Sequence, residues 1–97
     1  MSYPIALRVK AEKATDRAAD WYHRRNPDAA RAFLDAVDST LERVAENPYQ
    51  FPRIGPKLRR AVITGFPYSF LFKARETEVL VTTCVHFRRD PKRCGTG

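Results

Sequence analysis

The sequence predicts an α+β fold in the order β-α-α-β-β-β, with a helical hairpin packed on one face of a small, mainly antiparallel sheet. Three apolar runs rich in β-branched and aromatic residues fill residues 58–87 and are separated by short turn signals, as in a β-meander. Upstream, apolar residues recur at the three- and four-residue intervals of two amphipathic helices. A short alternating segment precedes these helices and supplies the first strand.

The first strand and the first helix are predicted from a change of period. Residues 5–10 alternate between apolar and polar side chains, which indicates a short strand. Residues 11–25 then carry small and aromatic side chains along one helical face: Ala11, Ala14, Ala18, Trp21 and Tyr22. We expect Trp21 and Tyr22, like Phe33 in the next helix, to lie in the core.

The second helix is predicted to begin at Pro27. Asn26 is a favoured N-cap residue, Pro27 fits the first helical position, and Asp28 places an acid in the first turn. An apolar stripe follows, and we expect the helix to end near Asn47 because Pro48 cannot continue it. The two helices should therefore form a hairpin with polar outer faces.

The sheet is predicted from the second half of the chain. Residues 49–57 have three turn-forming residues and no period, so they form a crossover in which Phe51 and Ile54 plug the edge of the core. Three strands follow, at residues 58–64, 69–74 and 78–87. Because helices cover only one face of this sheet, we expect the other face to be open and to be the place to look for function.

The length predicts one domain. A chain of 97 residues can bury a single modest core, and residues 92–97 lack any period and are expected to form a flexible tail. The longest uncharged stretch, residues 61–72, is interrupted by Gly65 and Pro67 and is far shorter than the roughly 20 apolar residues of a membrane helix. The N-terminus has no apolar signal-peptide core. We therefore expect a cytoplasmic protein without a membrane partner.

The cysteines and histidines do not predict a metal or cofactor site. Cys84, Cys94, His23 and His86 are too few and wrongly spaced for the known metal patterns. One cysteine lies in a predicted strand and the other in the tail, so we expect reduced, unpaired thiols. No bound metal and no cofactor are predicted.

The charge is divided unevenly along the chain. Residues 1–52 carry eight basic and eight acidic residues, whereas residues 53–97 carry ten basic and three acidic ones and so account for the whole net charge of +7. A neutral helical half and a basic sheet half predict a directional field and an anionic partner, either nucleic acid or an acidic protein segment. Most of the excess is arginine, whose planar fork suits phosphate or carboxylate.

Several motifs, taken in order, resemble those of one family. They are residues 14–22 (ATDRAADWY), Asn26-Pro27 with residues 30–34, residues 47–52, Arg59-Arg60 ahead of Phe66-Pro67-Tyr68, and the closing His86, Arg89 and Pro91. Over nearly its whole length the chain thus resembles the RelE/ParE superfamily of toxins from type II toxin-antitoxin systems, often labelled plasmid stabilisation proteins. Its ending looks closer to the ParE-like branch. It departs from the family pattern after Pro91, where an aromatic residue is usual and Lys92 stands here.

The resemblance implies a bacterial toxin and a cognate antitoxin. The antitoxin would wrap the toxin with an acidic C-terminal segment and would alone contact operator DNA. Members of the ParE-like branch inhibit DNA gyrase, whereas RelE-like members cut mRNA on the ribosome as mRNA interferases, and the motifs leave both targets open. A plain nucleic-acid-binding or inert domain is a third alternative.

Each alternative has its own candidate residues. A metal-free ribonuclease needs a base, an acid and cations for the phosphate, and the candidates are His86, Tyr68, Arg60 and Arg89. The candidates for binding a target are Lys57, Arg59, Arg60, Arg88 and Arg89. Arg59 and Arg60 alternate across a strand, so only one of them can face the open side of the sheet.

Overall fold

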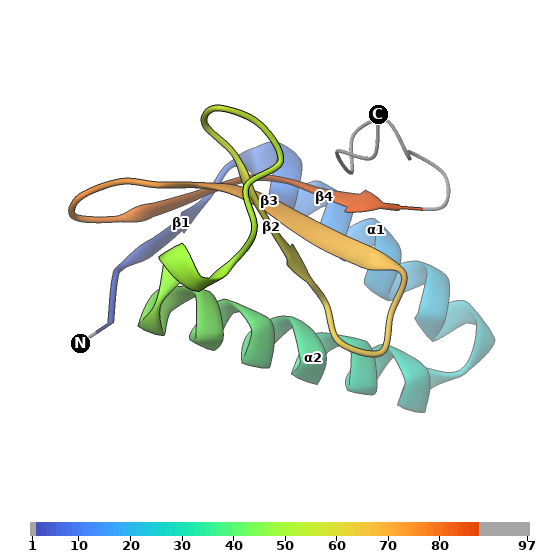
Figure 1. Cartoon of the computed structure of the whole chain (residues 1–97). Coiled ribbons are helices and arrows are strands. Elements are labelled where there is room, and N and C mark those ends of the chain that lie inside the picture. The colour runs from blue at the N-terminus through green and yellow to red at the C-terminus, as the bar shows by residue number, and fades with distance from the viewer. Residues whose placement is uncertain (1, 88–97) are drawn as a thin grey trace.

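A computed structural model describes residues 2–87, which form one four-stranded sheet with two helices packed on one of its faces (Figure 1). The elements, in chain order, are β1 (Ile5–Leu7), α1 (Val9–Arg25), α2 (Pro27–Glu46), the short 3-10 helix η1 (Pro48–Gln50), β2 (Arg59–Val62), β3 (Tyr68–Ala74) and β4 (Val79–His86). The predicted order and the α+β class are confirmed. The predictions that fall on Arg88, Arg89, Pro91 and the tail 92–97 lie outside the described residues.

The first strand is shorter than predicted, since β1 ends at Leu7 and α1 begins at Val9. The Arg8 N–H donates a hydrogen bond to the Val81 carbonyl at 2.9 Å, and α1 starts at the next residue. Val9 continues the apolar alternation of the sequence, but its side chain is 65% exposed on the first turn of α1. The alternation therefore predicted too long a strand, because the apolar side chain of Val9 is not buried.

The predicted helical hairpin is confirmed, including its turn at Asn26. The Asn26 N–H donates to the Tyr22 carbonyl at 2.8 Å and ends α1, while Asn26 Oδ1 accepts from the Asp28 N–H at 3.0 Å and caps α2. Pro27 occupies the start of α2, and the helix ends at Glu46, close to the predicted end. Neither helix, nor any other among the described residues, is long and apolar enough to cross a membrane.

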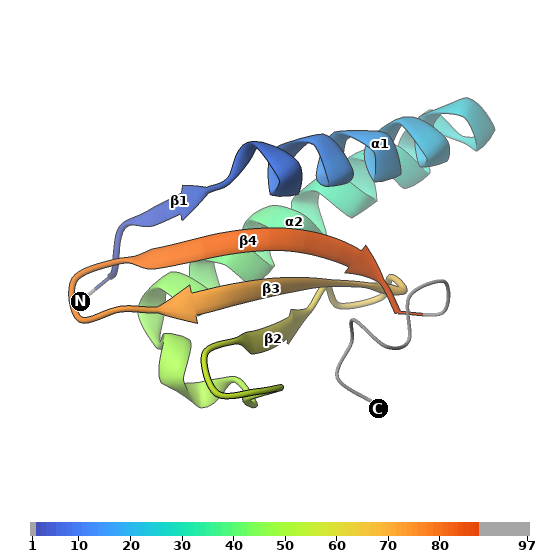
Figure 2. The same ribbon diagram turned by 90° about the horizontal axis from the view of Figure 1, so that it is seen from above.

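The sheet has the strand order β1-β4-β3-β2, in which β1 is parallel to β4 and the other pairs are antiparallel. It is thus mainly antiparallel, as predicted. β1 pairs only with Val79–Val81, so β4 reaches past it from Thr82 to His86. Figure 2 shows α1 diverging from β4 along this stretch. The outer edge of β4 there has no strand beside it within residues 2–87.

The main core lies between the helices and one face of the sheet. Phe33 of α2 and Phe72 of β3 have no exposed surface, and the partly buried Tyr22 packs on Phe33 with ring centroids 5.3 Å apart. Phe51 of the crossover packs against Phe72 at 5.8 Å, as predicted. Trp21 differs from the prediction, because its side chain is 37% exposed. Its place on α1 turns it towards the gap between α1 and β4 rather than into the core.

The sheet face opposite the helices is less open than predicted. Leu71 and Val85 are 4% and 3% exposed on this face and pack with Ile54 and Phe87. The crossover before β2 folds back because the Ile54 N–H donates to the Leu58 carbonyl at 2.9 Å, and it arches over the sheet on the side away from α2 (Figure 1). Ile54 therefore plugs a small second core rather than the edge of the first one.

Candidate functional site

The residues predicted to form a site are divided between the two faces of the sheet. Directly opposite residues of an antiparallel pair share a face. Arg60 is paired with Leu71 and lies on the face away from the helices, whereas Arg59 is paired with Phe72 and lies on the helix side. Of the two arginines, Arg60 is therefore the one on the face that was expected to be open.

Arg59 and Lys57 lie in a pocket of about 350 Å³ near the β2 edge of the sheet. We call it the basic edge pocket. Of the described residues that line it, five are basic and none is acidic: Tyr49, Arg53, Pro56, Lys57, Leu58, Arg59, Lys73, Ala74 and Arg75. Arg59 Nη1 donates to the carbonyls of Phe51 at 2.7 Å and Tyr49 at 3.4 Å. The same guanidinium lies 5.2 Å from the centroid of the Tyr49 ring, so its position is well defined.

Tyr68 and His86 lie together on the helix side of the sheet, opposite each other on β3 and β4. Their rings meet edge to face, with centroids 4.9 Å apart. Tyr68 is only 8% exposed and also contacts Phe33 in the core. The structure thus unites His86 with Tyr68, but places Arg60 on the other face. Lys73 of the basic edge pocket follows Tyr68 by five residues along β3, about 17 Å at about 3.3 Å per residue.

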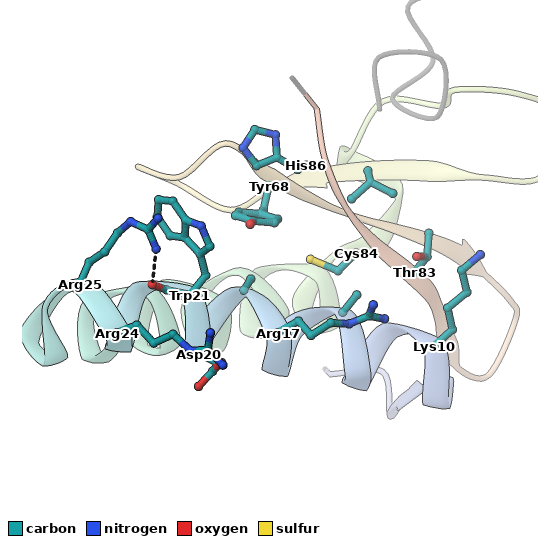
Figure 3. Close-up of a pocket in the computed structure, with 13 residues that line it drawn as sticks. Lys10, Arg17, Asp20, Trp21, Arg24, Arg25, Tyr68, Thr83, Cys84 and His86 are labelled. Carbon is teal, nitrogen blue, oxygen red and sulfur yellow. Dashed lines mark hydrogen bonds and ion pairs between the residues drawn. The ribbon is translucent and has the colours of Figure 1, made fainter. Parts of the chain in front are cut away.

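A second and larger hollow, of about 650 Å³, lies between α1 and the part of β4 that extends past β1 (Figure 3). We call it the α1–β4 groove. The residues that line it are Lys10, Ala14, Arg17, Ala18, Asp20, Trp21, Arg24 and Arg25 of α1 with Tyr68, Thr83, Cys84, Val85 and His86 of the sheet. Four of them are Lys or Arg and one is acidic. The groove is therefore positively charged on its helical wall, and His86 lies on the wall opposite.

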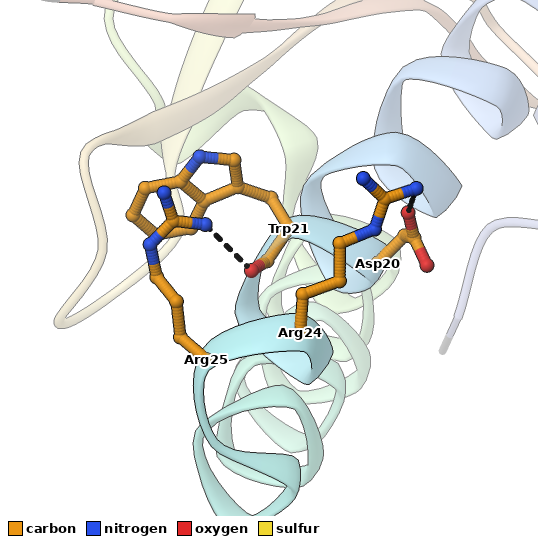
Figure 4. Close-up of polar contacts among 4 residues, drawn as sticks. All are labelled: Asp20, Trp21, Arg24 and Arg25. Carbon is orange, nitrogen blue, oxygen red and sulfur yellow. Dashed lines mark hydrogen bonds and ion pairs between the residues drawn. The ribbon is translucent and has the colours of Figure 1, made fainter.

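Trp21 and the arginines that follow it form one end of this groove. The Arg25 guanidinium carbon lies 3.6 Å from the centroid of the Trp21 ring, and Arg25 Nη1 donates to the Trp21 carbonyl at 3.2 Å (Figure 4). Arg24 pairs with Asp20 at 3.0 Å on exposed surface. Stacking on the indole holds the Arg25 cation at the groove, and within residues 2–87 no carboxylate forms an ion pair with it.

The helical wall of this groove was not predicted from the sequence. The first half of the chain has no net charge, and Trp21 was assigned to the core. A signal was nevertheless present, because five residues recur at intervals of four and three and so share one helical face: Lys10, Ala14, Arg17, Trp21 and Arg24. The net charge of a segment can be zero even when its basic and acidic residues lie on different faces of a helix, so it does not reveal a basic face.

Cys84 lies in the β4 wall of the groove and is 6% exposed. Burial raises the pKa of its thiol from 9.0 to about 11, although the hydrogen bond with the Thr15 side chain lowers it somewhat. The thiol is therefore protonated at neutral pH and unsuited to nucleophilic attack. Within residues 2–87, no three His, Cys, Asp or Glu side chains gather in a way that could hold a metal ion. Cys94 lies outside the described residues.

The two hollows differ in what they can bind. The α1–β4 groove combines cations, an exposed indole, small apolar side chains and a strand edge, so an acidic peptide can both pair with β4 and bury apolar groups there. The basic edge pocket offers mainly cations. Neither hollow holds all the residues that were predicted for cleavage of RNA.

Comparisons with known proteins point to one family. Residues 5–91 match the family model described as the ParE toxin of the type II toxin-antitoxin system parDE. Among curated proteins, no match to this chain is found. Solved structures do match, among them a chain from the chromosomal ParDE TA system from P. aeruginosa, which superposes with a TM-score of 0.76 at 17% sequence identity. The alignment covers 88% of this chain and 96% of that chain, so the two share a fold.

Proposed function

The chain belongs to the ParE family of toxins from type II toxin-antitoxin systems, and we propose that it arrests growth by binding DNA gyrase rather than by cutting RNA. It is the toxin component of such a system, and a cognate antitoxin is its partner. On this proposal the toxin makes and breaks no bond itself. It acts in the cytoplasm as a docking protein, and contact with operator DNA is left to the antitoxin.

The separation of the candidate nuclease residues supports this proposal. Cleavage of RNA without a metal requires a base, an acid and a cation within hydrogen-bond reach of the same phosphate. His86 and Tyr68 adjoin each other, but Arg60 projects from the opposite face of the sheet and the basic edge pocket begins about 17 Å away along β3. Tyr68 is also largely buried, so its ring packs in the core rather than facing a substrate.

A short expression pulse in bacteria that lack the antitoxin tests the proposal. Growth should stop while the 5′ ends of cellular mRNA stay unchanged, and the purified chain should inhibit supercoiling by gyrase. His86→Ala is the matched variant, and it should still stop growth, since no step of catalysis depends on the imidazole. Circular dichroism of the variant checks that the fold is kept.

The alternative is a ribosome-dependent mRNA endonuclease, and the same experiment distinguishes it. One observation favours it, because His86 faces a groove whose other wall carries Arg17 and Arg25. New mRNA ends inside translated frames, lost in the His86→Ala variant, would refute the gyrase proposal and establish this alternative.

We further propose that the acidic C-terminal segment of the antitoxin binds in the α1–β4 groove. Lys10, Arg17 and the stacked Arg25 supply positive charge there, and the edge of β4 beyond β1 can accept an added strand. A disordered segment must bury apolar surface to offset its loss of entropy, and the exposed Trp21 provides such surface. Charge, apolar area and a strand edge thus coincide in this groove.

A further inference from the structure

We propose that the basic edge pocket binds the phosphate backbone of duplex DNA. The site is inferred from the residues that line it, and the choice of gyrase-bound DNA as its natural ligand rests on the function proposed above. The pocket shares no lining residue with the α1–β4 groove. A ligand in one of the two hollows therefore makes its contacts without using the other.

The lining of the pocket carries a large excess of positive charge. Among the described residues, five cationic side chains line it and no carboxylate does: Arg53, Lys57, Arg59, Lys73 and Arg75. Within residues 2–87, one of these five side chains forms an ion pair: Arg75 with Glu78, at 3.3 Å. Both side chains of this pair are about half exposed. Like charges around a hollow of about 350 Å³ repel one another, and a bound polyanion relieves that repulsion.

Two of the arginines in the pocket are held in place by neutral groups. Arg53 Nη2 donates to the Pro56 carbonyl at 2.8 Å, and Arg59 Nη1 donates to the Phe51 carbonyl at 2.7 Å. A carbonyl oxygen orients a guanidinium without cancelling its charge. The side chains therefore lose little further conformational entropy when an anion binds. Their remaining N–H groups can donate hydrogen bonds to phosphate oxygens.

The composition of the pocket suits nucleic acid better than an acidic peptide. A peptide that orders on binding needs apolar contacts, whereas five of the nine described lining residues are cationic and the aliphatic ones are Pro56, Leu58 and Ala74. Phosphate groups need only charged donors, and the planar fork of arginine matches two phosphate oxygens. Since contacts to phosphate carry no sequence information, this binding is non-specific and distinct from recognition of an operator.

Fluorescence anisotropy with a short labelled DNA duplex tests the assignment. The variant is Lys57→Gln/Lys73→Gln, and the control is Lys13→Gln/Arg31→Gln, which removes the same charge from exposed helical positions outside both hollows. We expect the pocket variant to lose at least about tenfold in affinity. Its slope of log affinity against log salt should fall by about 1.8, because each lost phosphate contact removes about 0.9. The control should lose no more than about twofold.

Two results would overturn the assignment. Equal losses in the pocket variant and the control would mean that net charge alone draws the chain to DNA. Binding of a glutamate-rich peptide that depends on Lys57 and Lys73, with duplex binding unaffected by their loss, would make the pocket a protein-docking site. Thermal unfolding of each variant shows whether a loss reflects the pocket or the fold.

A gyrase supercoiling assay separates failure of this inference from failure of the proposed function. A wild-type chain that binds duplex DNA through Lys57 and Lys73 but leaves gyrase active would refute gyrase inhibition and retain the DNA site. If the wild-type chain inhibits gyrase and the Lys57→Gln/Lys73→Gln variant binds duplex DNA as tightly, the DNA site is refuted and the proposed function stands.

Discussion

Cys84 should make the fold less stable in alkaline solution. Its thiol lies in β4 with 6% of the residue exposed, and burial raises its pKa from 9.0 to about 11. The folded protein therefore holds the thiol proton more tightly than the unfolded chain does. The stability that results is fully present below pH 9.0 and is lost as the pH rises towards about 11.

The size of the effect follows from the shift in pKa. A shift from 9.0 to about 11 corresponds to about 3 kcal/mol, since one unit is worth about 1.36 kcal/mol. Small domains are stable by only about 5–15 kcal/mol in total. The loss at alkaline pH should therefore be a substantial fraction of the free energy of unfolding.

Urea unfolding at a series of pH values measures this loss. The wild-type chain is compared with Cys84→Ala, in which every other ionisable group is unchanged. Replacing the thiol adds a constant penalty, but the variant should lose less stability between pH 9.0 and about 11 than the wild type does. A difference in free energy between the two proteins that stays constant over that range would refute the burial argument.

Two further predictions concern the α1–β4 groove and the helical hairpin. Neutralising Lys10 and Arg17 with glutamine should weaken antitoxin binding between about twofold and thirtyfold, as expected for two exposed charge pairs, whereas Lys13→Gln/Arg31→Gln should not. Calorimetry at low and high salt measures this, and an affinity that does not change with salt would contradict the charge argument. Asn26→Ala should lower the free energy of unfolding by about 1 kcal/mol, because the Asp28 N–H loses its cap; unchanged urea unfolding would contradict this.

The helical hairpin could be predicted from sequence because its signals are local. The cap at Asn26, the proline at the next position and the stop before Pro48 each act within a few residues. The end of β1 could not be predicted in this way. β4 continues past β1, so the strand ends because α1 begins at Val9, which is apolar without being buried.

The site was harder to predict, because strand register and loop folding decide it. Whether Arg59 or Arg60 faces the helices depends on which of them is opposite Phe72. The basic edge pocket joins residues 49–59 to residues 73–75, which are brought together when the crossover folds back next to β3. Lys57 and Arg59 could be predicted as binding residues from their charge. Their grouping with Lys73 and their separation from His86 could not, because both depend on the folded chain.

The different construction of the two hollows bears on how an antitoxin would neutralise this toxin. The α1–β4 groove offers apolar surface and a strand edge as well as charge, whereas the basic edge pocket offers charge held by backbone carbonyls. An acidic segment bound beside Trp21 would leave Lys57 and Lys73 exposed, since the two linings do not overlap. On the two proposals together, neutralisation would act on docking to gyrase and leave contact with DNA phosphate intact. A toxin-antitoxin complex that still binds duplex DNA through these lysines, but no longer inhibits supercoiling, is the state that this arrangement predicts.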